Sequence, residues 1–300
     1  MTKPLRKAVI PAAGFGTRML PAAKSVPKEM LPILDRPTIQ YVIDEASAAG
    51  ASDIVLVTSK EKTALESHFA RHPLLEQRLK ESGRDALLAD LNSLIDRIRI
   101  HPVYQTEQLG LGHAVLQAKD AVGDEPFICL LGDTIFSAAD QFLPAMQLRQ
   151  AYERFGTSVI GLEEVSPEKV ERYGIVGGDV IEPGLLKLNT LVEKPSRDKA
   201  PSRFAIAARY ILTPAVFDCL EKTSPGKGGE IQLTDALRGM LQRGEAIHGV
   251  VLKSKRHDIG NPVDWLKTNL IFAAHDPKLW EQLRPTLDEL MNRGANEKTY

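Results

Sequence analysis

Residues 9–32, VIPAAGFGTRMLPAAKSVPKEMLP, place two glycines, an arginine and two lysines directly after a short apolar run. Glycine lets a backbone approach a ligand closely, and successive N–H groups in a turn can form an anion-binding concavity. The guanidinium of Arg18 is a planar fork that matches phosphate, and Lys28 adds a point charge. These residue types predict a phosphate-binding loop around Gly14 and Gly16.

Two well-known phosphate loops do not fit this stretch. A P-loop requires Gly-Lys-Ser/Thr, and the dinucleotide fingerprint requires a third glycine where this chain has Met19. Pro21, Pro27 and Pro32 disfavour a helix directly after the glycines, so we expect the segment to stay extended or looped over its ligand. A tight turn with solvated basic residues is the alternative, and Lys24 has no role that we can assign.

A second candidate group is the carboxylate of Asp133, which ends the apolar run 126–133. In open α/β sheets ligands collect at the carboxyl ends of strands. Because Mg²⁺ takes one or two carboxylates together with phosphate oxygens, Asp133 is a candidate magnesium ligand. Considered alone, an aspartate that begins a turn is the simpler interpretation.

Two further pairs of residues could contact a ligand. The amide of Gln105 offers both a donor and an acceptor to a nucleobase edge, and Gly110 permits a flat approach. We interpret the nearby His113 as a residue of helix packing or of support behind the site. Glu193 and Lys194 end a predicted strand, where adjacent side chains point to opposite faces, so both can serve one ligand only if the chain bends there.

The elements that position these residues follow a strand–helix rhythm in the first half of the chain. This rhythm predicts a doubly wound, mostly parallel sheet, with strands at 7–10, 53–58, 98–105 and 126–133 and helices at 37–50 and 110–122. After residue 156 the pattern is β-rich over 157–212, with helices predicted at 214–223, 230–244, 261–275 and from 277 to a polar tail. Residues 74–98 read as one or two inserted amphipathic helices that serve packing or a subunit contact. We expect a single domain, 1–300, with subregions 1–156, 157–262 and 263–300.

Composition limits the function further. The chain has 300 residues, 43% of them hydrophobic, and a net charge of −1, so we expect neither nucleic-acid nor membrane binding. Cys129 and Cys219 lie in apolar runs and are predicted to be buried, reduced thiols. No apolar run approaches a membrane span or a signal peptide, so we expect a cytoplasmic protein.

The motifs together resemble the sugar-nucleotide pyrophosphorylase family. The signature Gly-x-Gly-Thr-Arg, then Pro, then Lys before Leu-Pro is present, and IQYVIDEA, IVLVTS, GLGHAVL, GDEPF, VEKP, RYIL, GEIQLTDAL and HDIGN follow in order over nearly the whole chain. The resemblance implies a Rossmann-like, doubly wound mixed sheet with a β-rich sugar-binding part and C-terminal helices. The PKEMLP form favours the uridylyl branch, whose substrates are UTP and glucose 1-phosphate.

The resemblance also assigns roles to residues. It implies nucleotide contacts from Ala12, Ala13, Gly14, Gly16, Glu29, Gln105, Gly110 and Gly132, and sugar contacts from Gly174, Glu193 and Lys194. It implies a catalytic set of Arg18, Lys28, Asp133 and Lys194, with Mg²⁺ held by Asp133. Asp258 is a candidate second metal ligand or sugar-side acid. Gly132 stands where many relatives have proline, a departure that leaves the carboxylate in place but loosens the turn.

The expected reaction is direct in-line transfer of the uridylyl group to a sugar phosphate, with no covalent enzyme intermediate. No Gly-x-Ser-x-Gly elbow, Cys/His metal spacing or obvious Ser-His-Asp set is present, and this chemistry needs none of them. A thymidylyl enzyme, a different sugar 1-phosphate and a catalytically silent regulatory subunit remain open. The resemblance further suggests a homodimer or homotetramer.

Overall fold

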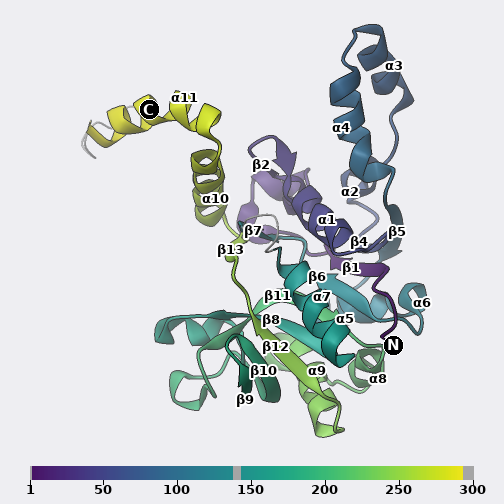
Figure 1. Cartoon of the computed structure of the whole chain (residues 1–300), viewed down its shortest axis with the longest axis vertical. Coiled ribbons are helices and arrows are strands. Elements are labelled where there is room, and N and C mark those ends of the chain that lie inside the picture. Colours follow the sequence, from purple (N-terminus) through teal and green to yellow (C-terminus); the bar gives the residue numbers. More distant parts are fainter. Residues whose placement is uncertain (1, 138–142, 293–300) are drawn as a thin grey trace.

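The protein is described by a computed structural model that covers residues 2–137 and 143–292 (Figure 1). Within these residues, nine strands form one sheet in the order β5-β4-β1-β6-β11-β8-β12-β10-β9. Their bounds are β1 Lys7–Pro11, β4 Asp53–Thr58, β5 Arg99–Tyr104, β6 Phe127–Leu130, β8 Ser158–Glu164, β9 Gly174–Glu182, β10 Leu185–Glu193, β11 Phe204–Leu212 and β12 Ile247–Val251. Two short ribbons pair β7 Thr134–Ser137 with β13 Lys255–Asp258, and β2 Pro32–Ile33 with β3 Arg36–Pro37.

The sheet changes character along its length. Strands β5, β4, β1 and β6 are parallel, as the strand–helix rhythm predicts. Strand β11 then runs antiparallel to both β6 and β8, and β10 runs antiparallel to β12 and β9. The mixed sheet is confirmed: the parallel run that begins at β5 ends at β6, and in the β-rich part hairpins such as β9–β10 reverse the chain without a crossover helix.

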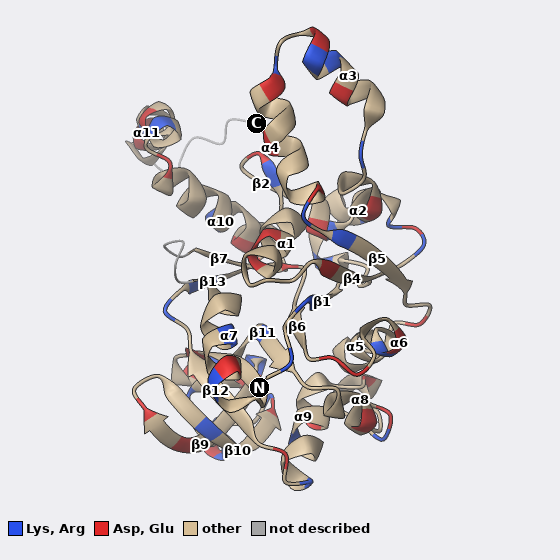
Figure 2. Cartoon of the chain, turned by 45° about the vertical axis from the view of Figure 1, so that its right-hand side comes forward, with Lys and Arg blue, Asp and Glu red and all other residues tan. Residues whose placement is uncertain are grey.

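Helices cover both faces of this sheet (Figures 1 and 2). Ile10 of β1 belongs to one core with α1 and α7, whereas Val9 belongs to a second core with α5, α8 and α9, because neighbouring strand residues face opposite sides. The helix bounds are α1 Thr38–Ala48, α2 Thr63–His68, α3 Pro73–Glu81, α4 Asp85–Ile95, α5 Leu111–Gln117, α6 Lys119–Val122, α7 Pro144–Phe155, α8 Ala215–Leu220, α9 Leu233–Gln242, α10 Pro262–His275 and α11 Pro277–Asn292.

Most of the predicted elements are present. Helix α7 was not predicted, although Ala145, Leu148 and Tyr152 are buried at helical spacing and would have supported it. Helix α2 and strands β2, β3, β7, β12 and β13 are also additional to the prediction. The predicted polar tail after α11 lies outside the described residues.

Two helical arms extend from the same end of the molecule in both views (Figures 1 and 2). One is the predicted insert, which forms the hairpin α3–α4, and the other is α10–α11. Both arms leave large apolar side chains exposed, namely Leu74, Leu75, Leu87, Leu91, Val263, Leu266, Leu270, Leu290 and Met291. Their role in packing or in subunit contact stays a prediction.

The charges, helices and cysteines of the described structure are relevant to the expectations drawn from composition. Positive and negative residues are interspersed along the elements (Figure 2). None of the helices in the described part of the chain is both long and apolar enough to span a bilayer. Cys129 and Cys219 are free and buried, as predicted.

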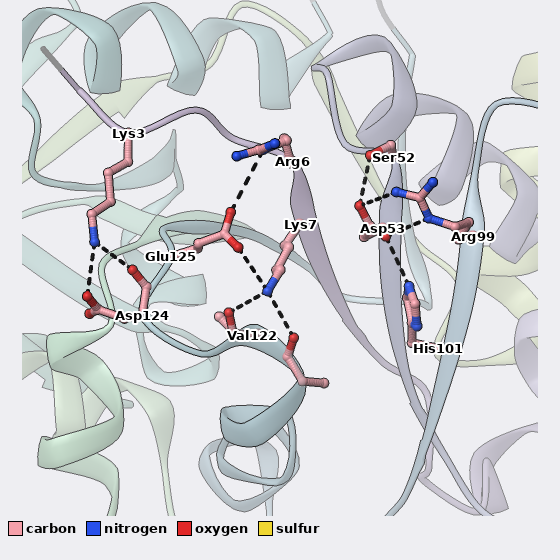
Figure 3. A network of polar contacts seen from close by, with 11 residues as sticks. Lys3, Arg6, Lys7, Ser52, Asp53, Arg99, His101, Val122, Asp124 and Glu125 are labelled. Atoms are coloured by element: carbon pink, nitrogen blue, oxygen red, sulfur yellow. Dashed lines mark hydrogen bonds and ion pairs between the residues drawn. The ribbon is translucent and has the colours of Figure 1, made fainter.

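The amino ends of the parallel strands are fastened by polar contacts (Figure 3). The ammonium of Lys7 donates to the carbonyls of Ala121 and Val122 and pairs with Glu125 at 3.0 Å. On the neighbouring strand Asp53 accepts two hydrogen bonds from Arg99, and these bonds lower the pKa of its carboxyl group well below the usual range. This edge is held together by contacts of the fold, and ligands of open α/β sheets collect at the opposite edge, at the carboxyl ends of the strands.

Candidate active site

The glycine-bearing segment after β1 is looped, as predicted. It contains three short 3₁₀ turns, Thr17–Met19, Ala22–Lys24 and Lys28–Met30, and no α-helix begins before Thr38. Gly16 has a φ of 65°, and a Cβ added there would lie 3.2 Å from the side-chain carbons of Lys28. The backbone therefore favours glycine at this position, and the Lys28 side chain would have to shift by a few tenths of an ångström to admit another residue.

A cavity of about 300 Å³ lies at the carboxyl ends of β1 and β6. This volume is near the lower limit of typical small-molecule sites. Eight of the predicted site residues line it, together with Gln108, Leu111, Glu230 and others: Ala12, Ala13, Gly14, Lys28, Glu29, Gln105, Gly110 and Asp133. Gly16 and Gly132 are not in the lining; Gly132 is packed behind it, where a Cβ would come within 3.2 Å of the Pro11 carbonyl.

Lys28 and Asp133 form an ion pair at the floor of this cavity. The Lys28 Nζ lies 2.5 Å from Oδ2 of Asp133. Burial by itself raises the pKa of Asp133, but the charge and hydrogen bond of Lys28 outweigh it, so that pKa is below the ordinary value. Burial likewise opposes the charged form of Lys28, and the charges of Asp133 and Glu29 raise its pKa nonetheless. Both groups are therefore charged at neutral pH.

The second predicted carboxylate, Asp258, is brought to Asp133 by the ribbon β7–β13. Asp258 pairs in register with Thr134, and the N–H of Ile259 donates to the Asp133 carbonyl at 3.0 Å. Burial first, and then the charge of Asp133, raise the pKa of Asp258. A cation between the two carboxylates would relieve this repulsion.

Arg18 reaches the same place from the glycine loop. A Cβ added at Gly260 would lie 2.8 Å from both Nη2 of Arg18 and Oδ1 of Asp258, so these two side chains meet at Gly260. The side chain of Arg18 is otherwise exposed, and Lys24 is exposed as well. The structure thus brings together Arg18, Lys28, Asp133 and Asp258, as the sequence predicts.

A buried ion pair supports β7, the strand that begins directly after Asp133. Arg209 is fully buried and binds the carboxylate of Glu45 through Nε and Nη2, the latter at 2.8 Å. The same Nη2 donates to the carbonyl of Thr134 at 2.8 Å, directly after Asp133. Helix α1 and strand β11 are thereby joined to the first residue of β7.

Gln105 is buried at the side of the cavity, with its amide held by a histidine. Its Nε2 lies 2.8 Å from Nδ1 of His113, and the other ring nitrogen of His113 lies 3.0 Å from Gln117. Gly110 has a φ of 99°, and a Cβ there would come within 2.7 Å of Glu230. The glycine is therefore required by its own backbone and by Glu230, in addition to the ligand approach that the sequence suggested.

The predicted sugar-side residues lie together at the ends of β9 and β10. A Cβ on Gly174 would lie 3.1 Å from Oε2 of Glu193, and the Lys194 Nζ is 3.3 Å from Oε1 of the same residue. The predicted bend is present, because Lys194 has a φ of 45°. Thr234, which the sequence did not single out, donates to Glu193 at 2.8 Å.

The nucleotide-side and sugar-side groups are adjacent but not in contact. Glu230 lines the cavity, and Thr234, four residues later, contacts Glu193. Within residues 2–137 and 143–292, Lys194 pairs with Glu193, and no ion pair joins it to Asp133 or Asp258. The sequence also missed Lys62, whose ammonium lies behind Ala12, Gly14 and Glu29.

The chain is similar to known proteins of one family. The sequence profile of the Nucleotidyl transferase family matches residues 7–274. The chain is 43% identical over 298 residues to a Bacillus subtilis (strain 168) protein named UTP–glucose-1-phosphate uridylyltransferase YngB, covering 99% of each chain.

Solved structures show the same fold. A UTP-bound UGPase from Acinetobacter baumannii is 35% identical, with a TM-score of 0.87 over 96% of this chain and 100% of that chain. A UDP-glucose pyrophosphorylase in complex with UDP-glucose is 36% identical, with a TM-score of 0.82 over 91% of this chain and 100% of that chain. The resemblance inferred from the motifs is thereby confirmed, and the chain belongs to the nucleotidyl transferase family, among relatives named UTP–glucose-1-phosphate uridylyltransferase.

Proposed function

We propose that this protein converts UTP and α-D-glucose 1-phosphate into UDP-glucose and diphosphate. The observation that carries the proposal is the meeting of Arg18, Lys28 and Asp133 beside a cavity whose other walls are the Ala12–Ala13–Gly14 backbone and Gln105. Support also comes from the solved relatives, which hold UTP in one case and UDP-glucose in the other.

In the proposed reaction a phosphate oxygen of glucose 1-phosphate forms a bond to the α-phosphorus of UTP. The bond from that phosphorus to the oxygen bridging the β-phosphate breaks, and its electron pair leaves with diphosphate. The attacking oxygen is already ionised near neutral pH, so no protein base is required. The barrier is the approach of two anions and the growth of charge on the leaving group, which alignment and fixed cations reduce.

Residues in different parts of the site would contact different parts of the substrates. Gln105, held by His113, and the Ala12–Ala13–Gly14 backbone would hold the uridine, and Arg18 and Lys28 would face the triphosphate. Glu193 and Lys194 would hold the sugar hydroxyls and the sugar phosphate. Glu29 is nearly completely buried and accepts a hydrogen bond from Lys62 through Oε2, so its Oε1 is free of that bond for the predicted base or ribose contact.

The proposal includes a divalent cation, for which we favour Mg²⁺. Asp133 and Asp258 are hard oxygen donors on paired strands, and the raised pKa of Asp258 reflects burial and the neighbouring charge that a cation would offset. The described residues hold no cluster of three or more metal-ligating side chains, so substrate oxygens or water would complete the coordination. The bound ion would neutralise triphosphate charge.

The test is direct. Purified protein with UTP, Mg²⁺ and glucose 1-phosphate should release diphosphate and form UDP-glucose, and no release above background would refute the proposal. Rates with UTP, dTTP and other nucleoside triphosphates, each combined with several sugar 1-phosphates, distinguish a uridylyltransferase from a thymidylyl enzyme or an enzyme for a different sugar 1-phosphate. A silent subunit would bind UTP without turnover.

We also propose a cytoplasmic homodimer or homotetramer. The two free, buried cysteines are compatible with a reducing compartment. The exposed apolar side chains of the α3–α4 hairpin and the α10–α11 arm offer the surface that association of copies would cover. Light scattering at micromolar concentration measures the state, and a single 33.0 kDa species would contradict the proposal.

A further inference from the structure

Lys62 is the residue whose contacts the proposed function leaves unexplained. It lies between β4 and α2, and its side chain is only 11% exposed. Its Nζ lies 2.5 Å from the carbonyl oxygen of Ala12, 2.7 Å from that of Gly14 and 3.0 Å from Oε2 of Glu29. An ammonium group has three donors, and these three acceptors use all of them.

All three acceptors belong to residues that line the nucleotide cavity, whereas Lys62 does not line it. Lys62 therefore holds the cavity wall from behind. Burial lowers the pKa of Lys62, and burial raises the pKa of Glu29, so each group depends on the other to remain charged.

The direction of the two carbonyls fixes the direction of the next two N–H groups. In a planar trans peptide the C=O of one residue and the N–H of the following residue point to opposite sides. With the carbonyls of Ala12 and Gly14 turned to Lys62, the N–H groups of Ala13 and Phe15 point away from it. Among the described residues, no protein atom accepts a hydrogen bond from either N–H.

We propose that Lys62 is a positioning residue that clamps the 12–14 backbone so that the N–H groups of Ala13 and Phe15 are presented to a bound nucleoside triphosphate. This inference rests on the proposed function for the identity of the ligand. Preformed N–H donors cost no reorganisation when the ligand arrives, so the clamp contributes to triphosphate affinity.

The competing explanation is that Lys62 serves only to pair with the buried Glu29. Two variants distinguish this explanation from the clamp. Lys62→Met removes the clamp and leaves Glu29 buried without its partner. Glu29→Gln/Lys62→Met removes both charges, so it relieves the buried charge without restoring a donor for the carbonyls of Ala12 and Gly14. The matched control is Lys60→Met, the same substitution at an exposed lysine of the same loop.

The measurements are the Kd of UTP by calorimetry, the KM for each substrate and the thermal midpoint. We expect Lys62→Met to raise the Kd and KM of UTP roughly ten- to hundredfold, because the hydrogen bonds from the charged Lys62 ammonium to the carbonyls of Ala12 and Gly14 are lost. The KM of glucose 1-phosphate should stay within about twofold. The double variant should regain thermal stability but keep the weak UTP binding, and Lys60→Met should match the parent.

Two results would overturn the clamp. One is an unchanged UTP affinity in folded Lys62→Met, and the other is a double variant that recovers both stability and UTP affinity, which would leave the ion pair as the whole role. Failure of the proposed function can be distinguished from failure of the clamp. A parent protein without turnover still gives a Kd for UTP, and the Kd values of the variants are compared with it.

Discussion

The ammonium nitrogen of Lys28 lies 2.5 Å from Oδ2 of Asp133, although 105 residues separate them. This contact joins the proline-rich loop after β1 to the end of β6. It places a cation and a candidate metal ligand on the same cavity floor. Because the Lys28 ammonium has further donors, it can keep Asp133 and still contact a phosphate.

Replacing Lys28 by methionine should slow turnover by roughly a hundred- to a thousandfold, the usual effect of removing one group that stabilises developing charge. The steady-state rate of diphosphate release measures it. Lys24→Met is the matched control, since Lys24 is an exposed lysine of the same loop, and its rate should stay within about twofold. Equal rates for the two variants would remove Lys28 from the site.

Asp133→Asn should reduce the rate supported by Mg²⁺ and move the Mg²⁺ titration to higher concentration, because a charged oxygen ligand becomes neutral. The rate measured against Mg²⁺ concentration tests this. Asp124→Asn, an exposed aspartate at the opposite edge of the sheet, should leave the titration unchanged. A normal titration for Asp133→Asn would refute its assignment as a ligand.

The substitution Lys194→Gly distinguishes the role of the Lys194 ammonium in turnover from the backbone strain at this residue. Lys194 has a φ of 45°, which costs a non-glycine residue about 1 kcal/mol, so glycine should preserve or slightly raise the free energy of unfolding. The lost ammonium should nevertheless reduce turnover by orders of magnitude and raise the KM for glucose 1-phosphate. Denaturant unfolding and kinetics on one preparation give both values, and a fully active variant would place the sugar phosphate elsewhere.

His248 should make the stability depend on pH. It is buried on β12 and stacks on Phe155 at 4.0 Å, and burial, followed by the charges of Lys187 and Arg154, lowers its pKa below 6.5. The unfolded chain therefore takes up a proton on acidification before the folded protein does. The free energy of unfolding should fall as the pH drops through 6.5, by at most about 1.4 kcal/mol per pH unit from this group.

Urea unfolding between pH 8 and 5.5 tests the histidine. In His248→Phe this contribution should be absent. The free energy of unfolding of the parent should therefore fall more steeply on acidification than that of the variant. Parallel curves for the two proteins would show that His248 titrates alike in the folded and unfolded states.

Much of the site could be predicted because the motifs resemble those of a known family. Asp133 and Lys194 also stand at the ends of predicted strands, and the carboxyl ends of strands are where ligands of α/β sheets collect. The prolines after Gly16 likewise predicted a loop in place of a helix, and the loop is present.

The residues that the sequence missed act through tertiary contacts. Lys62 reads as a surface lysine before α2, and only the fold shows that its side chain reaches Glu29 and two loop carbonyls. Arg209 lies in the apolar run of β11, where local pattern gives no sign of its partner Glu45 on α1. Long-range pairs of this kind have no signature in spacing or periodicity.

The central claim, direct transfer of the uridylyl group, is tested by the stereochemistry of the reaction. UTP that carries sulfur in place of one oxygen on the α-phosphorus has a defined configuration there. Reaction with glucose 1-phosphate and Mg²⁺ should give the sulfur-containing UDP-glucose with inverted configuration, because one in-line displacement inverts the phosphorus. Retention would reveal a covalent enzyme intermediate and contradict the mechanism, and no sugar nucleotide at all would contradict the proposed function.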